Sequence, residues 1–240
     1  MTRAANGEAI TKRSGWLIPL GIFVVTAALS GIVLLYYLGP RPASLIEERP
    51  SATSNASPVS LLVGGVSFVI PANYIRYSSA RRGGTLTQAA LFAVLPDFRG
   101  YKEGDAQVFA SNAADSPLVY VLLHEEQLKL GELDRLQRIY FNYVRDRTGR
   151  PGPFGLTQYE FRGDSGYRGE DLFVGHFGTR VVVLRCVRSS ASVPSPGCLR
   201  ELRLASHAAI TYRFKRSQLS RWREIATGVD TLMHSFMRGR

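Results

Sequence analysis

The sequence predicts an α+β protein in which an N-terminal single transmembrane helix precedes an exported domain of mostly antiparallel sheet with two packed helices. Three observations support this prediction. An uncharged apolar stretch of helical length lies near the N-terminus, and short apolar runs with period-two alternation fill residues 60–240. Two segments of that region instead repeat apolar residues at helical spacing. We therefore expect helices packed on an antiparallel sheet.

The apolar stretch covers residues 16–38 and contains no Asp, Glu, Lys or Arg. As a helix it would be about 35 Å long, enough to cross a hydrocarbon core of about 30 Å. Trp16 at one end and Tyr36 at the other occupy positions typical of interfacial aromatics. A cleaved signal peptide is the alternative, with Ala27 and Ala28 at the cleavage site, but the apolar run continues beyond them. We expect an uncleaved signal anchor that contacts the lipid bilayer.

The charges before the span predict its orientation. Three basic residues and one acidic residue precede it, and basic residues resist translocation, so residues 1–15 should form a cytoplasmic tail. Residues 39–59 are rich in Pro and Ser and should form an extended linker. Residues 60–240 would then be the exported α+β domain, held at the inner (cytoplasmic) membrane on its periplasmic or extracellular side.

Turn residues divide the exported domain into short apolar runs that we expect to be strands. In the last run three apolar residues alternate with Thr211, Arg213 and Lys215, so one face of the sheet should be buried and the other wet and basic. Short connections between the later runs favour antiparallel pairing. The expected strands are residues 66–70, 89–95, 106–110, 118–124, 156–162, 171–176, 180–187, 199–204 and 208–215.

Two segments are expected to be helices. The first covers residues 131–146, and the second begins after Ser217, the expected N-cap. The second carries a long apolar stripe, which we expect to pack across the sheet of its own domain with Trp222 beside Leu219 and Val229. Binding to a membrane or a partner through this stripe is the alternative.

Cys186 and Cys198 are the two cysteines of the chain, and they flank one short loop that contains Pro and Ser. In an oxidising compartment such a pair favours a disulfide, which would contribute about 3 kcal/mol by closing a short loop. Two reduced buried thiols are the alternative.

The net charge of +11 arises from 30 basic and 19 acidic residues, and it favours an anionic partner. Arg81 and Arg82 precede two glycines in an expected turn and form one candidate anion- or partner-binding group. A simple solubilising surface is the alternative for these charges. A second candidate group surrounds the junction of the last strand and helix and consists of Arg213, Lys215, Arg216, Arg221 and Arg223.

Catalytic motifs are weak. Residues 163–166 read Gly-Asp-Ser-Gly and resemble the segment around the nucleophile of chymotrypsin-like serine proteases, which makes Ser165 the candidate nucleophile of an exported hydrolase. Tyr167 follows where that family has a further glycine, and the upstream His124 lies in a different sequence context. His124 also lacks a second histidine at position 128 to complete a zinc site, so we expect neither a metal nor a cofactor.

These observations lead to one functional hypothesis and one alternative. The hypothesis is a single-pass membrane-anchored envelope protein whose exported domain binds another protein or an anionic envelope component without catalysis. The alternative is an exported hydrolase that uses Ser165. We expect no nucleic-acid partner, because the domain is exported and the sequence contains no recognisable nucleic-acid-binding module.

The orientation can be tested with a reporter that is active only outside the cytoplasm, fused after Arg240. We expect activity in whole cells, because the basic residues before the span hold the N-terminal tail in the cytoplasm. A matched fusion that lacks residues 16–38 should be inactive. If a reporter that is active only in the cytoplasm gave a signal when fused after Arg240, the predicted orientation would be wrong.

Overall fold

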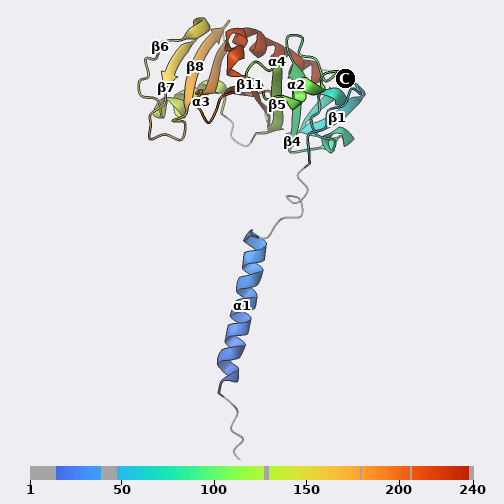
Figure 1. The fold of residues 1–240 in the computed structure, drawn as a ribbon, viewed down its shortest axis with the longest axis vertical. Helices are drawn as coiled ribbons and strands as arrows, with labels where there is room; N and C mark the ends of the chain where they lie inside the picture. Colours follow the sequence, from blue (N-terminus) through green and yellow to red (C-terminus); the bar gives the residue numbers. More distant parts are fainter. Residues whose placement is uncertain (1–14, 39–47, 127–129, 179, 206, 238–240) are drawn as a thin grey trace, which may run out of the picture. The chain divides into compact units, whose positions relative to one another are not determined.

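The chain divides into two compact units in the computed structural model, Met1–Glu48 and Arg49–Arg240. The first contains α1 (Leu17–Leu38), an apolar helix with a mean hydropathy of 2.4 over Ile18–Tyr36, long and apolar enough to cross a membrane. Residues 1–14 of the predicted cytoplasmic tail and residues 39–47 of the predicted linker lie outside the described residues. The structure describes residues 15–38, 48–126, 130–178, 180–205 and 207–237 (Figure 1).

The second unit is an α+β domain, as predicted, with an antiparallel sheet of eight strands and a smaller sheet of three. Its helices are α2 (Ala106–Ala110), α3 (Glu132–Arg138) and α4 (Trp222–Met237), and short 3₁₀ helices lie both before α2 and between these helices. The small sheet has the order β2 (Val66–Pro71), β1 (Pro58–Val63), β3 (Gly84–Thr85). The large sheet has the order β4 (Gln88–Val94), β5 (Leu118–Glu125), β11 (Ala208–Lys215), β10 (Gly197–Arg203), β9 (Arg180–Val187), β8 (Glu170–Phe177), β7 (Thr157–Glu160), β6 (Arg150–Pro151).

Three expected elements differ in the structure. Residues 106–110 form α2 and not a strand, because Phe109 packs edge-on against aromatic rings of β4 and of the preceding loop. The helix expected over residues 131–146 ends at Arg138, and its next turn is a 3₁₀ helix. The last α-helix begins at Trp222, because Ser217 does not cap it: the Ser217 hydroxyl donates instead to the carbonyl of Ala114.

The folded unit begins before the expected boundary at residue 60. The Ser51 N–H donates to the carbonyl of Arg76 at 3.0 Å, and the Ala72 N–H donates to the carbonyl of Ser57 at 2.9 Å. Strand β1 follows at once, from Pro58. The end of the expected linker is therefore fastened to the domain by backbone hydrogen bonds.

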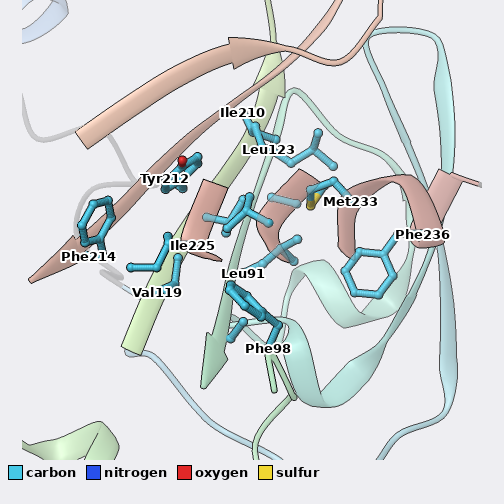
Figure 2. Close-up of a cluster of buried hydrophobic side chains, with 14 of the residues drawn as sticks. Leu91, Phe98, Val119, Leu123, Ile210, Tyr212, Phe214, Ile225, Met233 and Phe236 are labelled. Carbon is cyan, nitrogen blue, oxygen red and sulfur yellow. The ribbon is translucent and has the colours of Figure 1, made fainter. Parts of the chain in front are cut away.

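Helix α4 packs on one face of the large sheet, as predicted. Its residues Ile225 and Met233 lie among side chains of β4, β5 and β11, whereas Phe236 packs edge-on against Tyr74; all three are buried (Figure 2). Trp222 is 1% exposed, and its ring lies so close to β8 that a Cβ on Gly175 would come within 2.5 Å of it. The glycine at this position thus makes room for the indole.

Strands β9 and β10 are joined over a short length. Two residue pairs connect them, Cys186 with Cys198 and Arg185 with Leu199. The disulfide between Cys186 and Cys198 lies at this junction and is buried on the face that α4 covers. At its middle the large sheet is therefore held together by one disulfide and two pairs of facing residues.

The start of α3 fills the space between β9 and β10 beyond that junction. A Glu132 carboxylate oxygen accepts the Val183 N–H of β9 at 2.6 Å, taking the place of an acceptor on a neighbouring strand. The same carboxylate pairs with Arg200 of β10 through two hydrogen bonds of 2.8 Å. Arg200 also donates to the Tyr212 hydroxyl at 3.3 Å, and burial raises the pKa of Tyr212 to about 12.

A second buried cluster covers the other face of the β7–β9 half of the sheet. Leu136 of α3 and Tyr140 of the following 3₁₀ helix pack there against Leu172, Val174 and Val183. This half of the sheet is thus covered on both faces, by α4 on one and by the α3 region on the other.

Replacing Trp222 by Ala should lower the free energy of unfolding by about 3–5 kcal/mol, because it removes a fully buried aromatic and leaves a cavity beside Gly175. The measurement is denaturant unfolding of the full chain in detergent, followed by circular dichroism. Leu133→Ala is the matched control, since Leu133 is 48% exposed and should change stability little. An unchanged unfolding midpoint for Trp222→Ala would contradict its core position.

Replacing Glu132 by Gln should cost about 3–5 kcal/mol, because it keeps an acceptor for the Val183 N–H but leaves Arg200 buried without a counter-charge. The double variant Glu132→Gln with Arg200→Met should be more stable than Glu132→Gln alone, since no buried charge remains. Equal stability of the two variants would show that the buried charge is not the cause.

Candidate partner-binding site

One face of the large sheet remains partly exposed over β4, β5, β11 and β10. Val119, Val121 and Leu123 of β5 belong to the core cluster that α4 covers. Since side chains of a strand alternate between its two faces, the residues between them point to the opposite face. Tyr120 and Leu122 are two of these, both are partly exposed, and neither belongs to a buried cluster of the described residues. We define the open face by Tyr120, Leu122, Leu199, Thr211 and Arg213.

The strand register places Arg213 between apolar side chains. Arg213 of β11 lies opposite Tyr120 of β5 on one side and opposite Leu199 of β10 on the other. Directly opposed residues of antiparallel strands have Cβ atoms about 4.5–5.5 Å apart, close enough for their side chains to interact. In the next row Thr211 lies between Leu122 and Glu201. The open face thus combines an exposed guanidinium with aromatic and aliphatic neighbours.

Arg76 brings a second guanidinium to this face. Its central carbon lies 5.1 Å from the centre of the Tyr120 ring and 5.5 Å from that of Tyr77. Its backbone N–H donates to the carbonyl of Ala90 in β4, which places it at the edge of the sheet. Within the described part of the chain, neither Arg76 nor the exposed Arg213 forms an ion pair.

An ion-pair network borders the open face on the side of α3. Glu201 of β10 forms ion pairs with Arg135 at 2.8 Å and with Arg185 at 3.5 Å. Arg185 also pairs with Glu170 at 3.0 Å. Burial by itself would lower the pKa of Arg185, but Tyr140 and these carboxylates raise it on balance, so the guanidinium stays charged. Among the residues of β5, β11 and β10 that point to the open face, all of them described, Glu201 is the one carboxylate. Its negative charge is already paired with Arg135 and Arg185.

The structure brings two of the seven expected anion-binding residues to this face, Arg213 and Lys215. Lys215 donates from Nζ to Asn112 Oδ1 at 2.6 Å and to Ser195 Oγ at 2.7 Å. Arg216 instead pairs with Asp171 at 2.6 Å near the disulfide. Burial alone would raise the pKa of Asp171, but hydrogen bonds from Arg188 and Arg216 outweigh burial and lower it.

The other expected residues lie elsewhere. Arg221 pairs with Glu224 at 2.6 Å, and Arg223 stacks 4.5 Å from the Trp222 ring centre. Arg81 donates to the carbonyl of Ile75 and to the Ser51 hydroxyl, while Arg82 is exposed. The expected cluster at the strand-to-helix junction is therefore not assembled as one surface. Most of its members serve contacts within the domain.

Ser165 is 4% exposed and closes a turn. Its hydroxyl donates to the carbonyl of Arg162 at 2.8 Å and accepts the N–H of Tyr167 at 3.3 Å. His124 interacts instead with Thr211 on the open face. Among the described residues, Ser165 therefore has no histidine base, and no group of His, Cys, Asp or Glu is placed to hold a metal ion.

Sequence reasoning missed Arg76, Tyr120, Leu122 and Leu199. One signal was present: β5 reads Leu-Val-Tyr-Val-Leu-Leu and does not alternate with polar residues, which indicates a strand that is apolar on both faces. Arg76 could not be found in this way, because its contact with Tyr120 joins segments that are distant in sequence.

Two solved structures are similar to this chain. An immunity protein of the Stenotrophomonas maltophilia type IV secretion system matches with a TM-score of 0.54 and 16% sequence identity, over 75% of this chain and 93% of that chain. The iron-regulated outer membrane lipoprotein FrpD of Neisseria meningitidis gives a TM-score of 0.48 and 10% identity, over 80% of this chain and 98% of that chain. The likeness to the immunity protein shows a shared fold. No protein-family model and no curated protein sequence matches the chain.

Proposed function

We propose that this chain is a single-pass envelope protein whose folded unit binds a protein partner through the open face, without a catalytic step. The observation that carries the proposal is the group of partly exposed apolar residues Tyr120, Leu122 and Leu199 on the sheet face opposite the core. Aromatic and aliphatic side chains around an arginine are typical of the centre of a protein interface.

The proposal includes the location of the protein. Helix α1 is long and apolar enough to span the inner membrane, and the basic residues before it favour an N-terminus in the cytoplasm. The folded unit would then be periplasmic or extracellular. The buried disulfide supports this placement, because such bonds persist in oxidising compartments.

A protein partner fits this face better than an anionic polymer. A polymer would be held by many unpaired cations, whereas most of the expected basic residues are engaged in contacts within the domain. The fold is shared with an immunity protein of a secretion system, and an immunity role carried over to this chain would be a protein-binding role.

The proposal can be tested by replacing Leu122 with the photo-crosslinking residue p-benzoylphenylalanine in the full chain in living cells. We expect irradiation to give a discrete protein adduct, which mass spectrometry would identify and which the purified partner should reproduce. The control places the same residue at Thr227, an exposed position on α4. Adducts of equal yield from both positions, or none from position 122, would contradict a partner-binding role of the open face.

A further inference from the structure

We infer that Arg76, Tyr120 and Arg213 form a carboxylate-recognition site, so that the partner presents an Asp or Glu side chain at this point of the open face. This inference rests on the proposed function and specifies its chemistry.

The first argument is the charge balance of the face. Two guanidinium groups lie on either side of Tyr120, and neither forms an ion pair within the described residues. Nearby arginines differ: Arg135 and Arg185 share Glu201, and Arg203 pairs with Glu126. A single carboxylate bound beside Tyr120 would be attracted by both positive charges.

The second argument is geometry. The ring of Tyr120 lies beside Arg76 at 5.1 Å and directly across the strand pair from Arg213. A guanidinium that stacks on an aromatic ring keeps its N–H groups free at the edge, where they can grip a carboxylate through two parallel hydrogen bonds.

The third argument identifies the source of the carboxylate as a protein segment. Leu122 and Leu199, both partly exposed, adjoin this position in the sheet register. A lipid headgroup or a polyanion would leave these apolar side chains in water. A strand or loop with one acidic residue among apolar ones would cover them and also satisfy the two arginines.

The test uses the full chain in lipid nanodiscs and two synthetic peptides, one with glutamate among leucines and tyrosines and one with glutamine in its place. We expect the glutamate peptide to bind about tenfold more tightly, in line with one charge-assisted hydrogen-bonded pair. Arg213→Gln and Arg76→Gln should each abolish this preference. Arg213→Lys should retain part of it, because the charge remains but the paired donors are lost.

Arg150→Gln is the matched control, because Arg150 is exposed and lies on β6, at the opposite edge of the large sheet from β4 and β5. Its binding should equal that of the unchanged protein. Equal binding of both peptides, no binding of either, or an equal loss in Arg150→Gln would each overturn the carboxylate site. If the photo-crosslinked adduct at position 122 still forms in those cases, the open face binds a partner but does not recognise a carboxylate. If that adduct is also absent, the proposed function is contradicted as well.

Discussion

Beyond the disulfide junction, the connection between β9 and β10 depends on the ion pair between Glu132 and Arg200. Strands β9 and β10 pair over two positions, and beyond them the carboxylate of Glu132 supplies the acceptor that β9 would otherwise lack. Since a buried charge is costly unless it is paired, Arg200 and Glu132 fix each other in place. This contact also positions α3, which covers the β7–β9 half of the sheet.

Local sequence patterns predicted the fold class and most strands, because a half-buried strand shows its burial directly as alternation. Patterns failed where a distant contact decided the structure. Residues 106–110 form a short apolar run that we expected to be a strand, yet Phe109 packs against Phe92 and the segment forms the helix α2. The space between β9 and β10 and its occupation by Glu132 join residues far apart in sequence, and no local period encodes them.

The candidate site could likewise be predicted only where a local pattern encodes it. Alternation in β11 correctly separated the buried Tyr212 from the exposed Arg213. Nearness along the chain did not bring Arg216, Arg221 and Arg223 onto the same face, because each finds a carboxylate, a carbonyl or a ring within the domain. The composition therefore overstates the free positive charge of the surface.

The backbone hydrogen bond from Ser51 to Arg76 has a mechanical consequence. Any tension that reaches the folded unit along the chain enters at Arg49 and acts on this bond before it reaches β1. Arg76 is also the residue whose side chain stacks on Tyr120. Peeling of residues 49–57 from the domain would thus disturb Arg76 first, so force on the chain before Ser51 reaches a residue that borders the open face.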